Sequence, residues 1–275
     1  MSTEAKVASH YTRAQLKETI LQAVRNVAPD ADHLTPLDFA PADEFHVGGL
    51  EATRYLAAQM ELRPGLHLLD VGSGIGGPAR YFASEHGCKV TGVDLTEEFV
   101  ETAKGLTEVL KLDDLAHFQQ ASALALPFDA ATFDGAYMIH VGMNMADKAD
   151  VFREIRRVLK PGGLFTIFDI LRAGEGPMRY PVPWALNEET SFVADVKSYR
   201  DALDAAGFSV VQERSRRAFA IEFMQRAMAN AGQSGSPTLG LHLLMGDKVR
   251  VMLPNVLAMM QEGVLDPVEL FARAI

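Results

Sequence analysis

A run of glycines between an apolar strand and a helix constrains this chain more than any other feature. Leu66 to Val71 is predicted to be a strand, and residues 72–77 supply four glycines before a helix begins. Glycines at such a junction let the backbone approach a ligand, while the helix N-terminus directs amide groups toward it. The next predicted strand leads to Asp94, whose carboxylate can accept hydrogen bonds from a ribose diol. The two features together predict a nucleotide-like ligand.

The rest of the chain continues this alternation of strands and helices. The predicted strands are 66–71, 89–93, 116–120, 133–139, 164–170, 208–212 and 268–274. The fifth is almost wholly apolar, as expected for a central strand of a parallel sheet that helices cover on both faces. A helix is predicted at 148–160, with its apolar residues on one face and a stop at Pro161-Gly162-Gly163. We therefore expect an α/β fold with a mostly parallel sheet.

Breaks at proline and glycine divide the chain into four parts, which we interpret as one domain. They are a helical N-terminal cap at 1–62, a ligand-binding core at 63–213, a mainly helical insertion at 214–266 and a final strand at 267–275. A length of 275 residues is compatible with one large domain. The insertion is expected to form a lid or the surface of a homodimer.

Composition and charge narrow the class of protein. With 26 Lys and Arg against 36 Asp and Glu, the net charge of −10 has the wrong sign for a nucleic-acid partner. The basic residues of helix 148–160 are interpreted as a solvated face. Cys88 is the only cysteine, which excludes an internal disulfide and a multi-cysteine metal site and fits a reducing compartment. The sequence shows no signal peptide and no membrane span, so we expect a soluble, cytoplasmic protein without a metal.

The glycine loop alone does not choose the ligand. Gly72, Gly74 and Gly77 also satisfy the G-x-G-x-x-G pattern of dinucleotide-binding proteins, so an NAD-dependent oxidoreductase stays open. Such an enzyme would need a second mononucleotide-binding half, of which the sequence gives no clear sign. The motifs of zinc peptidases, P-loop nucleotidases and common serine hydrolases are absent from the sequence.

Several ordered motifs resemble a known family. The segments are LLDVGSGIGGPARYFA, VTGVDLT, LALPFDAATFDGAYM and REIRRVLKPGGLFTIFDI, and the resemblance covers about residues 45–212. Together they resemble the class I S-adenosylmethionine (SAM)-dependent methyltransferases, whose sterol, tocopherol, phosphoethanolamine and sarcosine/dimethylglycine members share the GIGG loop. DEFHVGGLEAT and PVPWA look most like the glycine-derivative members. The resemblance implies a Rossmann-like seven-strand sheet with an antiparallel last strand.

The resemblance also implies a cofactor site for SAM, with S-adenosylhomocysteine as product and no metal. The expected cofactor-binding residues are Asp70, Gly72, Ser73, Gly74, Gly76, Asp94, Leu95, Ser122 and Ala123. Asp70 would lie near the methionine amino group and Asp94 would bind the ribose hydroxyls. Ser122 stands where the family commonly has an aspartate for the adenine amino group, and it would accept that hydrogen bond more weakly.

Residues for the methyl acceptor are expected on the loops after the fourth and fifth strands. His140, after the fourth strand, is a candidate catalytic residue that could face the substrate or act as a base. His46, in a segment that resembles the family's N-terminal flap over SAM, is a second candidate that could touch cofactor or substrate; for His140 the alternative is a hydrogen-bonded structural histidine. Tyr180 and Trp184 are candidate substrate contacts, Trp184 as a cation–π wall or as the core of its own loop. Met143 is a candidate for an apolar pocket.

We therefore expect a SAM-dependent methyltransferase that acts on a small molecule. The main hypothesis is N-methylation of an amine such as a glycine derivative. The alternative is O- or C-methylation of a lipid-like or natural-product acceptor, favoured if the Met- and Phe-rich insertion lines the pocket. The other classes of protein are an NAD-dependent oxidoreductase and a non-catalytic SAM-binding protein.

Overall fold

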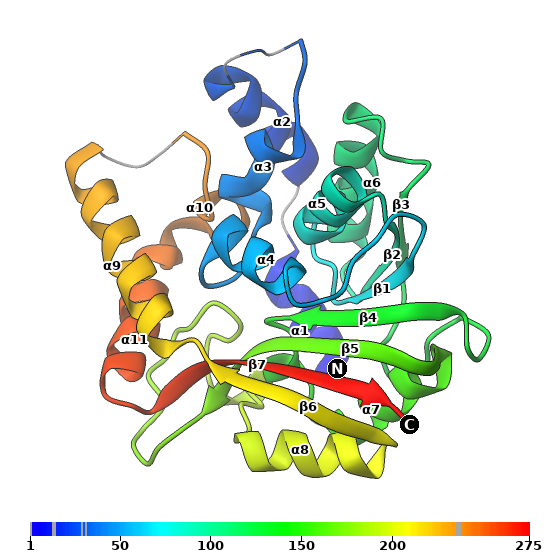
Figure 1. The fold of residues 1–275 in the computed structure, drawn as a ribbon. Coiled ribbons are helices and arrows are strands. Elements are labelled where there is room, and N and C mark those ends of the chain that lie inside the picture. Colours follow the sequence, from blue (N-terminus) through cyan, green and yellow to red (C-terminus); the bar gives the residue numbers. More distant parts are fainter. Residues whose placement is uncertain (1, 13–14, 29, 31, 235–237) are drawn as a thin grey trace.

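A seven-stranded sheet runs through the computed structural model, which describes residues 2–12, 15–28, 30, 32–234 and 238–275 (Figure 1). The strands are β1 (His67–Val71), β2 (Lys89–Asp94), β3 (Ala116–Gln120), β4 (Phe133–Ile139), β5 (Leu159–Arg172), β6 (Phe208–Ser215) and β7 (Leu265–Ala274). Their order is β3-β2-β1-β4-β5-β7-β6. The first five are parallel, and β7 lies antiparallel between β5 and β6. The predicted seven-strand Rossmann-like fold with an antiparallel last strand is confirmed.

Alternate side chains of each central strand enter two separate cores, because successive residues of a strand point to opposite faces. Leu69 of β1 packs in the core with α7 (Lys148–Val158) and α8 (Val196–Ala205). Its neighbour Leu68 packs in the other core with α5 (Gly77–His86) and α6 (Glu97–Val109). Figure 1 shows these two pairs of helices on opposite sides of the sheet. Both faces are covered, so the central strands are mostly apolar.

Further helices lie before β1 and between β6 and β7 in the chain. The N-terminal helices are α1 (Thr3–Tyr11), α2 (Leu16–Val27), α3 (Pro36–Asp43) and α4 (Gly49–Ala57). Before β7 come α9 (Arg217–Ser234), α10 (His242–Met245), the short 3₁₀ helix η3 (Gly246–Lys248) and α11 (Val249–Gln261). Ile20 of α2, Phe39 of α3 and Met252 of α11 share one apolar cluster, so the N-terminal helices and the insertion pack together. The assignment of all four parts to one domain stays a prediction.

A buried ion pair joins the N-terminal helices to the core. Arg80 of α5 is fully buried, and its Nη2 donates at 2.7 Å to the Asp43 carboxylate at the end of α3. The same guanidinium donates to the carbonyl oxygens of Ile75 and Ala103. Gly77 leaves room for this contact, since a Cβ there would lie 2.4 Å from the Asp43 carbonyl oxygen. The glycine loop therefore also serves helix packing.

The boundary between α7 and β5 differs from the prediction. The helix ends at Val158 rather than at 160, and the strand begins at Leu159 rather than at 164. Leu159 pairs with Phe133, and the register of the two strands shifts before Gly135 pairs with Leu164. Proline and glycine at 161–163 were predicted to form a turn, but the backbone passes through them as a bulged extension of the strand.

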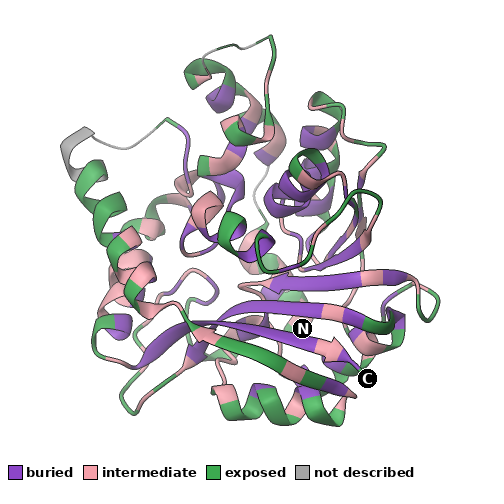
Figure 2. Ribbon diagram, viewed as in Figure 1, coloured by how far each residue is buried: buried purple, intermediate pink, exposed green. Residues whose placement is uncertain are grey.

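Burial decreases toward one edge of the sheet. Figure 2 shows β4, β5 and β7 mostly buried and β6 largely exposed. In the part of the chain that the structure describes, no helix combines the length and the apolar character needed to cross a bilayer.

Candidate active site

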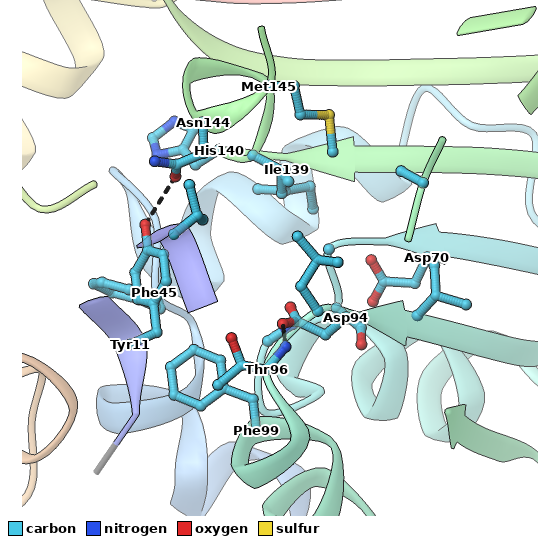
Figure 3. Close-up of a pocket in the computed structure, with 18 of the residues that line it drawn as sticks. Tyr11, Phe45, Asp70, Asp94, Thr96, Phe99, Ile139, His140, Asn144 and Met145 are labelled. Carbon is cyan, nitrogen blue, oxygen red and sulfur yellow. Dashed lines mark hydrogen bonds between the residues drawn. The ribbon is translucent and has the colours of Figure 1, made fainter. Parts of the chain in front are cut away.

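The carboxyl ends of β1, β2 and β4 border a first cavity of about 220 Å³ (Figure 3). Asp70 enters it from β1, Asp94 from the end of β2 and Ile139 from β4, while Tyr11 and Phe45 close the opposite side. Ligands of open α/β sheets bind at this edge. Of the residues expected to bind a cofactor, those that line the cavity are Asp70, Gly72, Ser73, Gly74, Asp94, Leu95 and Ala123. Gly76 and Ser122 are not part of its wall.

The glycine loop has a shape that side chains would prevent. Gly72 has a φ of +75°, and a Cβ there would lie 2.5 Å from the Val141 side chain. Gly74 also has a positive φ, of +53°, but nothing lies within 4 Å of its Cβ position. The loop is tied to β2, because the N–H groups of Gly72 and Ser73 both donate to the Val93 carbonyl oxygen. Gly74 therefore presents bare backbone on a fixed loop to whatever fills the cavity.

Two aspartates on neighbouring strands differ in the hydrogen bonds that their carboxylates accept. Asp94 accepts hydrogen bonds from the N–H groups of Gly74 and Thr96, each at 2.9 Å. Asp70 is only 3% exposed, and its Oδ2 has no hydrogen-bond partner among the described residues. Burial raises the pKa of Asp70 to about 8, while the nearby Tyr137 hydroxyl opposes this increase and the charge of Asp94 adds to it. A cationic group in the cavity would satisfy Asp70 and lower that pKa.

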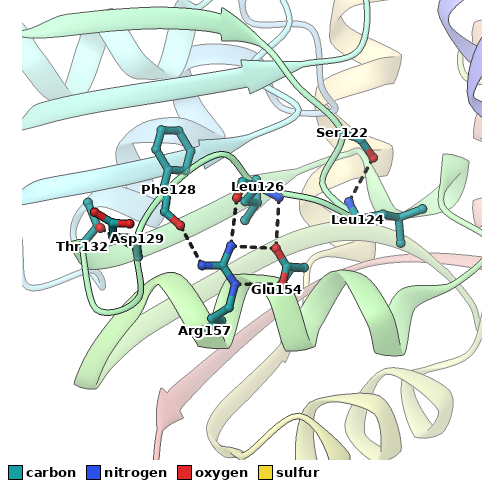
Figure 4. A network of polar contacts seen from close by, with 8 residues as sticks. All are labelled: Ser122, Leu124, Leu126, Phe128, Asp129, Thr132, Glu154 and Arg157. Carbon is teal, nitrogen blue, oxygen red and sulfur yellow. Dashed lines mark hydrogen bonds and ion pairs between the residues drawn. The ribbon is translucent and has the colours of Figure 1, made fainter.

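The loop between β3 and β4 is attached to α7. Arg157 donates to the carbonyl oxygens of Leu126 and Phe128, and Glu154 accepts from the Leu126 N–H (Figure 4). Arg157 is exposed, as expected for a solvated face, and its hydrogen bonds also attach the loop to α7. The Ser122 hydroxyl donates to Glu4 of α1 at 2.5 Å and accepts from the Leu124 N–H. The predicted hydrogen bond from a ligand to Ser122 would compete with these contacts.

A second cavity of about 200 Å³ adjoins the first. Its wall is apolar apart from tyrosine, tryptophan and histidine side chains, and it contains Tyr11, Phe45, His46, Val47, His140, Met143, Ile170, Pro183, Trp184, Phe223, Met224, Ala227, Met228, Leu241, Leu253 and Val256. Four of these residues also line the first cavity, namely Tyr11, Phe45, His46 and His140. A reaction between two ligands, one in each cavity, would take place beside these four side chains.

The two histidines at this junction are buried, and their environment fixes which nitrogen carries the proton. The Nε2 of His46 lies 3.1 Å from the Gly49 carbonyl oxygen, which can only accept, so Nε2 is protonated and Nδ1 is bare. The Nδ1 of His140 accepts from the Val47 N–H, so its proton is on Nε2. Burial lowers the pKa of His46 to about 4 and that of His140 well below its usual value. Both rings are therefore neutral at pH 7.

His140 also has an unusual backbone. Its φ of +53° lies in the left-handed region that favours glycine, directly after β4. The N–H of His140 donates to the Phe168 carbonyl oxygen at 2.7 Å, and Nε2 is buried without a partner among the described residues. A strained residue with an unsatisfied donor at a cavity wall is typical of a functional site.

Helix α1 covers both cavities. The Tyr11 hydroxyl donates at 2.9 Å to Asn144, whose side-chain amide donates in turn to the carbonyl oxygens of Trp184 and Thr190. His10 of the same helix is hydrogen-bonded to the Pro183 carbonyl oxygen. Asn144 lies in the 3₁₀ helix η1 (Gly142–Asn144) and thus connects α1, the loop after β4 and the loop after β5.

The structure separates the three residues predicted to contact substrate. Met143 and Trp184 line the second cavity. Trp184 is 3% exposed and its indole N–H donates to Ser191, so the ring both completes a core cluster and forms part of the wall. Tyr180 packs against that cluster but lines neither cavity.

The sequence reasoning missed Tyr11, Phe45 and Asn144. Tyr11 and Phe45 belong to the segment before the first strand, and Asn144 to a loop that lacks a regular pattern. Their role arises from contacts between distant segments, such as the 133 residues that separate Tyr11 from Asn144. The one usable signal was position, because Asn144 follows the strand that carries His140.

Comparisons with known proteins agree with this geometry. Residues 69–167 match the protein family described as methyltransferase domain. A sterol 24-C-methyltransferase of Gibberella zeae is 37% identical over 133 residues, 48% of this chain and 35% of the relative. The 2-methyl-6-phytyl-1,4-hydroquinone methyltransferase of Synechocystis is 34% identical over 153 residues, 53% of this chain and 47% of the relative. The chain thus spans about a third to a half of the length of these curated relatives.

A solved structure extends the comparison to the whole fold. The geranyl diphosphate C-methyltransferase of Streptomyces coelicolor, solved with Mg²⁺, geranyl diphosphate and S-adenosylhomocysteine, superposes with a TM-score of 0.72 at 16% identity. The match covers 100% of this chain and 98% of that one. Such low identity establishes the fold, and the family match over 69–167 adds the sequence motifs of the core. The chain thus has the fold of class I SAM-dependent methyltransferases, and residues 69–167 match the methyltransferase domain family.

Proposed function

We propose that this protein transfers a methyl group from SAM to a carbon or an oxygen of an apolar small molecule. The observation that carries the proposal is the pair of cavities that meet at Tyr11, Phe45, His46 and His140. The first cavity has carboxylates and bare backbone, and the second has apolar walls. Two ligands of different chemistry can therefore meet at a junction of buried side chains.

The residues of the first cavity fit SAM. The Oδ2 of Asp70, which has no hydrogen-bond partner among the described residues, suits a ligand ammonium. The open space at Gly74 suits close approach of the backbone, and Asp94 has lone pairs left for hydroxyls. When bound, SAM supplies an electrophilic methyl group on a sulfonium. The protein holds the two reactants in line and excludes water from the junction.

The second cavity favours a lipid-like acceptor over the glycine derivative of the main hypothesis. Among the described residues, no Lys, Arg, Asp or Glu lines it, whereas a glycine derivative carries a carboxylate that would lose its hydration there. Phe223, Met224 and Met228 of α9 belong to its wall, which was the condition set for the O- or C-methylation alternative. The sterol and hydroquinone relatives point in the same direction.

Calorimetry and an acceptor panel test the proposal in two steps. We expect SAM and S-adenosylhomocysteine to bind with micromolar affinity while NAD does not bind. Binding of NAD alone would instead support the oxidoreductase hypothesis. Formation of S-adenosylhomocysteine is then measured with hydroquinones carrying prenyl tails of increasing length, a sterol, sarcosine and phosphoethanolamine.

The acceptor panel separates the hypotheses. Turnover that increases with the length of the prenyl tail would support the proposal, and turnover of sarcosine alone would restore the amine hypothesis. SAM binding without turnover of any acceptor would favour the non-catalytic SAM-binding protein. The expected homodimer stays a prediction, which light scattering of the same samples checks.

A further inference from the structure

A hydrogen-bonded chain leads from the junction of the two cavities to a buried carboxyl group. The Nε2 of His46 lies 3.2 Å from the Thr53 hydroxyl, and this hydroxyl donates at 2.6 Å to Oε2 of Glu44. The three residues come from the end of α3, the turn after it and α4. All three are buried, with Glu44 only 4% and Thr53 0% exposed. His46 lines both cavities.

The direction of the hydrogen bonds is consistent along the chain. Nε2–H of His46 is shared between the Gly49 carbonyl oxygen at 3.1 Å and the Thr53 oxygen at 3.2 Å, and the Thr53 hydroxyl donates to Glu44. The nitrogen left for a ligand is Nδ1, which has no hydrogen bond in the described part of the structure. A base that faces a ligand through one nitrogen and a carboxyl group through the other is the arrangement used for general-base catalysis.

We propose that Nδ1 of His46 accepts the proton that the methyl acceptor loses. Thr53 and Glu44 are positioning residues, through which a proton passes from the other side of the imidazole ring to the Glu44 carboxylate. The inference rests on the proposed function. As the acceptor oxygen or carbon forms its bond to the methyl carbon, the methyl–sulfur bond breaks and its electron pair stays on sulfur. The acceptor proton moves to Nδ1, the Nε2 proton moves to the Thr53 oxygen, and the Thr53 proton moves to the Glu44 carboxylate. The proton later leaves Glu44 for solvent.

The surroundings of Glu44 suit a proton acceptor near neutral pH. Burial raises its pKa to about 8, the charges of Asp43 and Asp70 add to this increase, and the Thr53 hydrogen bond and Arg80 oppose it. The charged and titratable groups around it are Asp43 on α3, Asp70 on β1, Arg80 on α5 and His46. Arg80 is already paired with Asp43, so it does not neutralise Glu44 as well. A sulfonium in the first cavity would favour the ionised form of Glu44.

The relay restricts the class of acceptor. It serves a nucleophile that must lose a proton in a dry site, such as a phenolic or enolic hydroxyl or a carbon acid. A neutral amine attacks with its lone pair and can give up its proton afterwards, so it gains least. We therefore infer an apolar acceptor with a weakly acidic hydroxyl at its reacting end, of the hydroquinone type.

Nuclear magnetic resonance tests the relay without turnover. The protein, labelled with ¹³C-glutamate and ¹⁵N-histidine and saturated with S-adenosylhomocysteine, is titrated over the neutral and alkaline range; Glu44→Gln and His46→Gln assign the two signals. We expect a bare Nδ1 on His46 and a Glu44 carboxyl that titrates well above an ordinary glutamate. Thr53→Val should raise the Glu44 midpoint by about one unit, a tenfold change in proton affinity, and Thr53→Ser should restore it. A protonated Nδ1, or the same midpoint in all variants, would overturn the relay.

Kinetics with a prenylated hydroquinone as the probe give the second readout. The wild-type kcat should rise with pH through the Glu44 midpoint. Glu44→Gln and Thr53→Val should lose this rise and lower kcat roughly 10- to 100-fold, with little change in the KM for the hydroquinone, and Thr53→Ser should recover most of kcat. A pH profile that Thr53→Val leaves unchanged would assign these residues to structure alone. Failure to bind S-adenosylhomocysteine or to methylate any acceptor would refute the proposed function instead, while the titration still decides the relay.

Discussion

Among the residues that line the first cavity, Asp70 is a carboxylate in an unfavourable environment. Its carboxyl is buried, Oδ2 is unpartnered among the described residues, and its pKa is raised from 3.8 to about 8. Between these two pH values the folded, ligand-free protein holds a proton that the unfolded chain has lost, so its stability falls as the pH rises through the window. This pH dependence is the opposite of that of a salt-bridged aspartate, whose contribution to stability increases as the pH rises. A bound ammonium would remove the penalty.

Asp70→Asn therefore should have opposite effects on stability and on binding. At pH 8.5 the ligand-free variant should melt several degrees above wild type, with a smaller difference at pH 5, because the amide carries no charge to bury. Its affinity for SAM should fall roughly 10- to 100-fold, since a charge-assisted hydrogen bond is lost. Calorimetric scans at both pH values and a binding titration measure the two effects. Weaker binding together with lower stability at pH 8.5 would mean that Asp70 holds the fold rather than a ligand.

At the level of elements, α1 is held over the cavities by contacts at both of its ends. Glu4 accepts from Ser122, Lys6 pairs with Glu189 and Tyr11 donates to Asn144. Tyr11→Phe removes the last contact and keeps the ring in place. Because one hydrogen bond contributes about 0.5–1.5 kcal/mol, we expect the KM of the acceptor to rise roughly two- to tenfold, with a kcat that changes less. Lys197→Met, which removes an exposed ion pair on α8, is the control and should leave KM unchanged. Equal KM values for Tyr11→Phe and wild type would argue against α1 as a cover.

Some elements of the fold were predictable from sequence patterns and others were not. The central strands were predictable because their apolar runs are buried on both faces. The glycine loop was predictable because positive φ and close contact require glycine there. The start of β5 was not predictable from the sequence. Proline and glycine at 161–163 indicate a turn, but pairing of Leu159 with Phe133 extends the strand. The second cavity was predictable only in part. Met143 and Trp184 were found from their loops, but the position of Tyr11 depends on docking of α1, which no local pattern encodes.

At the scale of the whole molecule, the N-terminal cap, the core and the insertion share buried contacts. Arg80 of the core pairs with Asp43 of the cap inside the protein, and the apolar cluster of Ile20 and Met252 joins the cap to the insertion. If these parts are one cooperative unit, damage to one contact lowers the stability of all of them. We therefore expect thermal unfolding in a single transition, which S-adenosylhomocysteine shifts upward because it binds only the folded state.

Arg80→Leu tests this unity. Removal of one partner from a buried ion pair leaves an uncompensated charge, at a cost of about 3–5 kcal/mol, which corresponds to a melting temperature lower by roughly 10 °C. The whole unfolding transition should shift to lower temperature, both in calorimetry and in the fluorescence of Trp184, which lines the second cavity. The matched control is Lys197→Met, since Lys197 forms an exposed ion pair with Asp201 at 79% and 64% side-chain exposure, and it should shift the transition by about 1 °C or less. If Arg80→Leu instead split the calorimetric trace while the Trp184 signal kept its wild-type midpoint, the cap would unfold independently of the core and the chain would not be one domain.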